Sequence, residues 1–337
     1  MILSLEMATL EPDFSVSVEG SFEEGEAQSL GRFAFDVTKA LAEGCKLDIS
    51  KLKKIVISPN FAGALQKVTS EYNHKSASSF TQSKQATAAG QLVTKTGSDG
   101  QPEEFTLVLS TSFFIALFNE EGRYTVSEEG MKVALHLLHH ELIHVHEKNT
   151  LNCLTGGFEI NEYGDALLLS STRVWSEYLA NYMASTSAQK ETVDEFLDNL
   201  LRVLSEVTLE IDELVLNYAE RGMPLDEMFF EVKKRIKLII NSYGYAIGYV
   251  HGIDIDLSVY FPELALALSV SKLNRPLSKL GDALRELMVK YKNNEIKGYD
   301  DFDEVSEAVD STFNAFGLTL TCSDMTNSDA VLNIQVA

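Results

Sequence analysis

The residue types and spacing best suited to chemistry lie in a short segment near the middle of the chain. His140 and His144 are four residues apart, and Glu141 directly follows the first of them. On a helix, two histidines at this spacing project from one face, one turn apart, and can bind the same metal ion. A carboxylate placed as Glu141 is can take a proton from a water molecule that the metal activates. The pattern His-Glu-x-x-His therefore predicts a zinc (Zn²⁺) site with Glu141 as the general base.

Three further histidines flank this motif. His136 lies one turn before His140 on the same stripe, so His136 and His140 form an alternative pair, but no glutamate follows His136. We interpret His136 as a packed residue or one that supports the ligands, and His139 and His146 as structural. Apolar residues fill the positions between them, which is typical of a helix buried in a protein core.

A catalytic zinc site needs a third protein ligand and keeps one position open for water. We expect this ligand to be Glu177, on a predicted amphipathic helix in which Ala180 and Ala184 follow at steps of three and four. Small residues at these positions allow close packing against the helix that carries the two histidines. Alternative ligands in the intervening segment are Glu159, Glu162 and Asp165.

This arrangement resembles the zincin-fold metallopeptidases of the gluzincin type, in which a His-Glu-x-x-His helix and a glutamate from a downstream helix bind one zinc ion. The resemblance covers about residues 25–185. It implies that His140, His144 and Glu177 hold Zn²⁺ and that Glu141 acts on a peptide or protein substrate. The chain departs from the best-known gluzincins in a longer interval between His144 and Glu177. It also has Asn181 where some gluzincins place an aspartate that orients a ligand histidine.

Peptide hydrolysis through zinc usually needs a further donor that stabilises the oxyanion. Tyr245, Tyr249 and His251 are the candidates, and we take Tyr245 and His251 as catalytic residues with Glu141. Glycines at 244, 248 and 252 form a stripe suited to close helix packing. The alternative interpretation is that these tyrosines pack in a crowded helix interface.

The elements that would position these residues indicate an α+β fold. Strands are expected over 54–58, 88–94 and 105–110, a small mixed sheet of three or four strands that resembles the sheet beside the active-site helix of zincins. A helix over 23–47 precedes this sheet, and Ser127 begins the motif helix, which runs to His146. We expect a zincin-like metal-binding half over 1–187 and a mainly α-helical half over 188–337. The expected later helices and strands are 171–184, 191–220, 225–249, 262–273, 276–291, 318–322 and 331–336.

Composition narrows the function classes. The 337 residues carry a formal net charge of -22, from 28 basic and 50 acidic side chains, which disfavours binding to nucleic acid or to an anionic membrane surface. The three cysteines lack metal-binding spacing and no stretch is apolar enough to span a membrane, so we expect a cytoplasmic protein.

Two other classes of function stay open at this point. The zinc site can be structural, in a catalytically inactive zincin-like protein that acts by interaction with partners. The acidic, amphipathic segment 191–220 leaves room for such a protein partner on the helical half. The site can also hydrolyse a non-peptide amide or ester, because the water chemistry is the same.

Overall fold

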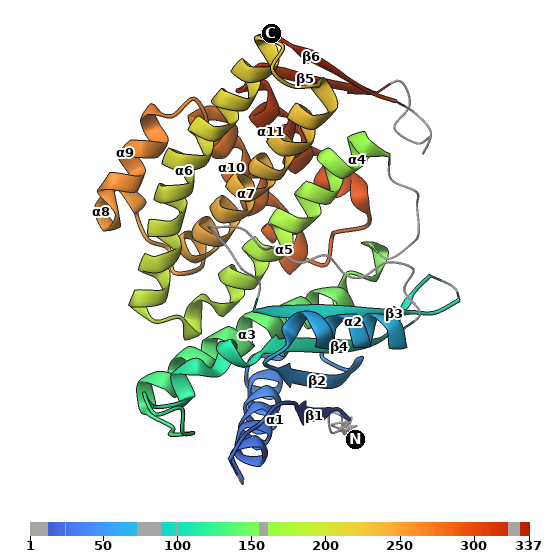
Figure 1. The fold of residues 1–337 in the computed structure, drawn as a ribbon, viewed down its shortest axis with the longest axis vertical. Coiled ribbons are helices and arrows are strands. Elements are labelled where there is room, and N and C mark those ends of the chain that lie inside the picture. Colours follow the sequence, from blue (N-terminus) through green and yellow to red (C-terminus); the bar gives the residue numbers. More distant parts are fainter. Residues whose placement is uncertain (1–12, 24, 73–88, 99, 155–160, 323–330) are drawn as a thin grey trace, which may run out of the picture. The chain divides into compact units, whose positions relative to one another are not determined.

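The computed structural model describes residues 13–23, 25–72, 89–98, 100–154, 161–322 and 331–337 (Figure 1). By their internal contacts the residues group into two compact units, Met1–Thr150 and Leu151–Ala337. The sequence places its division later, after residue 187. The helix that carries Glu177 groups with the second unit because it packs along another helix of that unit.

The first unit is built on a four-stranded mixed sheet. Its strands are β1 (Ser15–Val18), β2 (Leu52–Ser58), β3 (Gly90–Thr96) and β4 (Pro102–Ser110), in the order β1-β2-β4-β3. Strands β1, β2 and β4 are parallel, and β3 pairs antiparallel with β4. The predicted small mixed sheet is confirmed, and β1 adds a strand that the sequence pattern does not reveal.

Helices cover this sheet because its two central strands are apolar on both faces. Helix α2 (Phe61–Glu71) packs through Leu65 and Val68 on Val56 and Val108. The residues directly before and after each of these two valines are also buried. They point to the opposite face of the sheet, since side chains alternate along a strand. Helix α1 (Glu26–Gly44) packs on β1, and helix α3 (Glu128–Thr150) contacts β3, β4 and α1.

Both ends of α3 are held by side-chain hydrogen bonds, which fixes the helix that carries the motif. At its start, the Gly130 amide donates to Ser127 Oγ at 3.0 Å, as expected for a helix cap at Ser127. Near its end, the Asp48 amide donates to His146 Nδ1 at 2.8 Å. Asn149 Nδ2 donates to the Asp48 carbonyl oxygen at 2.9 Å. The predicted helix through His146 is confirmed and runs one further turn.

The second unit is mainly helical, as expected. Long helices α6 and α7 lie side by side, and α5 packs along α7 (Figure 1). The elements of this unit are η2 (Asn152–Leu154), α4 (Glu162–Ala166), α5 (Leu168–Ala184), η3 (Ser185–Ser187), α6 (Lys190–Ala219), α7 (Leu225–Gly252), α8 (Leu257–Tyr260), α9 (Pro262–Val270), α10 (Asn274–Lys292), η4 (Tyr299–Phe302), α11 (Asp303–Asn314), β5 (Leu318–Cys322) and β6 (Leu332–Val336).

The glycine stripe of α7 brings its backbone close to that of α5. A Cβ atom added at Gly248 would lie 2.7 Å from the carbonyl oxygen of Tyr178, and one at Gly252 would lie 2.6 Å from that of Tyr182. Distances this short leave no room for a side chain. The predicted role of this stripe in close packing is confirmed, and the helix that it contacts is the one that carries Glu177.

Some expectations need adjustment or fall outside the described part of the chain. Helix α4 lies between the motif helix and the helix predicted over 171–184, in a segment for which no element was predicted. Residues 155–160 of that segment lie outside the described residues, as does residue 88 of the strand predicted over 88–94. The two strands predicted in the tail are present as β5 and β6, and they pair antiparallel. Among the helices of the described ranges, none is long and apolar enough to cross a lipid bilayer.

Candidate metal centre

His140 and His144 meet on one face of α3 in the way that their spacing predicts. Their Nε2 atoms are 3.2 Å apart, and their rings are nearly perpendicular, with 4.8 Å between centroids. Two ligands bonded to one tetrahedral zinc ion at the usual lengths are about 3.3 Å apart. The two nitrogens therefore have the separation that a shared zinc ion requires.

A buried glutamate lies behind one of these histidines. Glu147 Oε2 is 3.8 Å from His144 Nδ1, and the Glu147 side chain is only 3% exposed. The Nδ1 atom of His144 thus faces a carboxylate while its Nε2 atom faces His140. In metal sites a carboxylate on the far nitrogen fixes the tautomer and the orientation of a ligand histidine. Glu147 can serve His144 in this way.

The carboxylate of Glu141 lies against strand β3. A Cβ atom built on Gly90, the first residue of β3, would be 2.5 Å from Glu141 Oε1 and 2.7 Å from Glu141 Cδ. The side chain of Glu141 therefore occupies the space that any other residue at position 90 would fill. This contact places the predicted general base at the edge of the sheet, one residue along the helix from His140.

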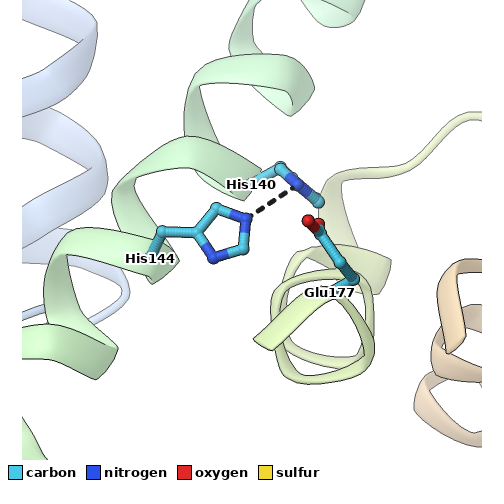
Figure 2. Close-up of side chains that lie close together, drawn as sticks. All are labelled: His140, His144 and Glu177. Atoms are coloured by element: carbon cyan, nitrogen blue, oxygen red, sulfur yellow. Dashed lines mark hydrogen bonds between the residues drawn. The ribbon is translucent and has the colours of Figure 1, made fainter. Parts of the chain in front are cut away.

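Glu177, the predicted third ligand, lies with the two histidines. One ligand atom from each of His140, His144 and Glu177 lies within 4.8 Å of the others, and all three side chains are half-buried. Figure 2 shows the Glu177 carboxylate pointing toward His140. Two imidazoles and one carboxylate form a donor set that suits catalytic zinc.

The alternative third ligands have other surroundings. Asp165 accepts hydrogen bonds from Lys233 Nζ at 2.7 Å and Lys237 Nζ at 3.2 Å, so it is part of an ion-pair cluster. Glu162 is exposed in the first turn of α4. Glu159 lies outside the described residues. In the part of the chain that the structure describes, only one group of three side chains lies close enough together to bind one metal ion. This group is His140, His144 and Glu177.

The flanking histidines are packed residues. His136 and His139 are each 2% exposed. Burial, with a smaller contribution from the charge of His140, lowers the pKa of His139 to about 4. Burial also lowers the pKa of His146, whose Nδ1 accepts from the Asp48 amide. The interpretation of His139 and His146 as structural agrees with these contacts.

The predicted oxyanion donors lie on α7 in contact with neighbouring helices. The ring of Tyr245 packs on Phe196 at 5.4 Å between centroids. His251 Nδ1 is 3.0 Å from the Tyr178 hydroxyl, and Arg285 donates to His251 Nε2 at 2.8 Å. Because a guanidinium only donates, the proton of neutral His251 must be on Nδ1. A role of Tyr245 or His251 in stabilising an oxyanion stays a prediction.

Two residues of this region were not singled out from the sequence, Glu147 and Gly90. Glu147 has a readable signal, because it follows His144 by three residues and so lies on the same side of the helix. Gly90 has only the weak signal of a glycine at the start of a strand.

Asn181, where some gluzincins have an aspartate, is fully buried, and its Nδ2 donates to the Tyr245 carbonyl oxygen at 2.9 Å. Asn181 therefore holds α5 to α7.

Comparison of this chain with protein-family models, with curated proteins and with solved structures finds no match.

Proposed function

We propose that this protein is a zincin-like, zinc-dependent peptidase. His140, His144 and Glu177 are the proposed ligands of Zn²⁺, and Glu141 is the proposed general base. The observation that carries the proposal is the separation of 3.2 Å between the Nε2 atoms of His140 and His144, on the helix that also presents Glu141. A pair of imidazoles held at this distance suits a shared cation, and the adjacent carboxylate suits proton transfer.

The residues divide the chemistry between them. Zinc bound here would lower the pKa of a water molecule and polarise the substrate carbonyl. Glu141 accepts the proton of the attacking water at its carboxylate and then delivers it to the leaving nitrogen. Glu147, whose Oε2 lies 3.8 Å from Nδ1 of His144, is the proposed carboxylate that orients this ring so that Nε2 serves as the ligand atom. Tyr245 or His251 would donate to the developing oxyanion.

Zinc binding is tested by metal analysis of the purified full-length chain after dialysis. We expect one zinc ion per chain, loss of that ion in the double variant H140A/H144A, and weaker binding in Glu177→Gln. Glu195→Gln, an exposed glutamate on α6, is the matched control and should bind zinc as the unaltered chain does. Equal zinc content in the double variant and the unaltered chain would rule out this site.

Turnover is tested with Glu141→Gln, which keeps the size of the side chain and removes its basicity. We expect this variant to retain zinc and to lose peptide hydrolysis by a factor of at least about 10², the usual contribution of a general base. Cleavage is followed by mass spectrometry on a mixture of peptides, with amide and ester substrates in parallel. Cleavage only of the amides or esters would assign the non-peptide alternative. Zinc binding without any turnover would favour the inactive interaction protein.

A further inference from the structure

The space beside the Glu141 carboxylate depends on the absence of a side chain at Gly90. The three atoms nearest to a Cβ built on Gly90 all belong to Glu141: Oε1 at 2.5 Å, Cδ at 2.7 Å and Oε2 at 3.1 Å. Real Cβ atoms essentially never approach another heavy atom to within 3.0 Å. Any other residue at position 90 must therefore displace the carboxylate of Glu141 or the strand.

Backbone conformation does not explain the glycine. The φ angle of Gly90 lies outside the left-handed region, unlike that of Gly100 or Gly122. Gly90 pairs in regular antiparallel register with Leu109 of β4, so alanine would fit the strand backbone. A glycine in a strand weakens it and often marks a place where another group approaches closely. Here the approaching group is a carboxylate on α3.

From this contact we infer that Gly90 is a positioning residue for the general base: its missing side chain sets where the Glu141 carboxylate stands relative to the two histidines. This inference rests on the proposed function. Gly90 acts through Glu141 and has no proton or ligand atom of its own to contribute. A methyl group at position 90 moves the carboxylate by about 1 Å, and a misplacement of that size can cost about 10²-fold in rate.

The colliding group distinguishes Gly90 from a glycine that serves packing. The Glu141 carboxylate is the far end of a flexible side chain, so it can rotate away and the fold can keep its stability. At Gly130, by contrast, a Cβ would lie 1.9 Å from the backbone oxygen of Ala116, which cannot move without the chain. Gly44, at the end of α1, has nothing within 4 Å of its Cβ position.

The experiment uses Gly90→Ala in the full-length chain, with Gly130→Ala and Gly44→Ala as controls. For Gly90→Ala we expect zinc affinity within about twofold of the unaltered chain, a kcat lowered about 10²-fold and a KM that changes little. The midpoint of thermal unfolding should fall by no more than about 2–4 °C. Gly130→Ala should lower the midpoint much further, and Gly44→Ala should change neither activity nor midpoint.

A second comparison tests the same contact without turnover or metal. In metal-free protein, Gly90→Ala should lower the unfolding midpoint when Glu141 is present. It should leave the midpoint unchanged or raise it in the Glu141→Ala background, where the methyl group has room. With the shorter acid, G90A/E141D should be at least as active as Glu141→Asp alone.

The outcomes separate the inference from the proposed function. If the unaltered enzyme is active and Gly90→Ala has the same kcat, the inference is overturned and the peptidase proposal stands. Absence of the stability coupling between positions 90 and 141 would overturn it as well. If the stability coupling between positions 90 and 141 is present but the unaltered chain hydrolyses no substrate, the peptidase proposal is contradicted and the contact itself stands.

Discussion

The two ring nitrogens of His144 face different groups. Nε2 faces His140, and Nδ1 faces the buried Glu147 carboxylate at 3.8 Å. A carboxylate on Nδ1 favours the tautomer whose proton is on that atom, and in this tautomer Nε2 is unprotonated, as a metal ligand must be. If the proposed site binds zinc, its affinity should therefore depend on Glu147, which is not one of the proposed ligands.

Glu147→Gln tests this dependence. Glutamine keeps the shape of the side chain but not its charge, and loss of such a supporting carboxylate typically lowers metal affinity about 10–100-fold. We expect a decrease in this range, measured by competition with a chromophoric chelator. The exposed Glu195→Gln serves as the control for a change of charge. Unchanged zinc affinity in Glu147→Gln would show that Glu147 does not orient His144.

At the residue scale, the sequence indicates the proposed ligands better than it indicates the residues proposed to support them. His140, Glu141 and His144 follow from spacing alone, because a helix fixes the relative direction of residues four apart. Glu177 is distant in the chain and was one of several candidate acids. The role of Gly90 follows from a contact between a strand and a helix, which neither segment's pattern encodes.

Among the helices, α7 approaches the backbone of α5 most closely at its glycines. At Gly248 the atoms nearest to an added Cβ belong to Tyr178, Asn181 and Tyr182, and the nearest is a backbone oxygen at 2.7 Å. Asn181 adds a hydrogen bond from α5 to the Tyr245 carbonyl oxygen. The position of the α5 backbone, which carries Glu177, therefore depends on the absence of a side chain at Gly248.

Gly248→Ala should destabilise the second unit, because a methyl group forces the two helix backbones apart. Overpacking of this kind costs about 1–3 kcal/mol in the free energy of unfolding. Urea unfolding followed by circular dichroism measures the change. Gly298→Ala is the control, since nothing lies within 4 Å of its Cβ position. If Gly248→Ala and Gly298→Ala have the same free energy of unfolding, the close approach of α5 and α7 does not contribute to stability.

The elements themselves were largely predictable where a periodic pattern is long. The span of β5 matches its prediction, and the longer helices match within a few residues. Strand β1 was missed because it has four residues and owes its conformation to parallel pairing with β2, more than thirty residues away. Helix α11 was left unassigned although Val305, Ala308 and Val309 recur at helical spacing and are buried.

For the molecule as a whole, buried histidines link stability to pH. Burial, together with the nearby charge of Arg285, lowers the pKa of His251 to about 4, while Asp282 opposes this effect. An unfolded histidine has a pKa of about 6.5. Between these values the unfolded chain binds more protons than the folded protein. The free energy of unfolding should therefore fall as the pH is lowered from about 6.5 to about 4.

His251→Gln removes this titration and should make the dependence on pH shallower, by up to about 1.4 kcal/mol per pH unit. Urea unfolding of both proteins at several pH values between 4 and 7 provides the measurement. His139, whose pKa is also lowered to about 4, should leave a residual slope in the variant. Identical slopes with and without His251 would contradict the assignment of a neutral, half-buried imidazole at this position.

Several basic side chains of α7 form ion pairs with acids. The basic cluster in the sequence from Lys233 to Lys237 is largely neutralised by acids: Lys233 and Lys237 pair with Asp165, and Arg235 pairs with Glu210 and Glu231. A concentrated positive surface does not arise from these three side chains. The expectation that nucleic acid is not a partner stays a prediction.

The most direct test of the proposed centre is X-ray absorption spectroscopy at the zinc edge on the purified full-length protein. We predict scattering from two imidazole ligands, with zinc–nitrogen distances of about 2.0–2.1 Å, and light-atom ligands in the remaining positions. The imidazole signal should be absent in H140A/H144A. A spectrum without imidazole scattering, or one dominated by sulfur at about 2.3 Å, would contradict a centre built on His140, His144 and Glu177.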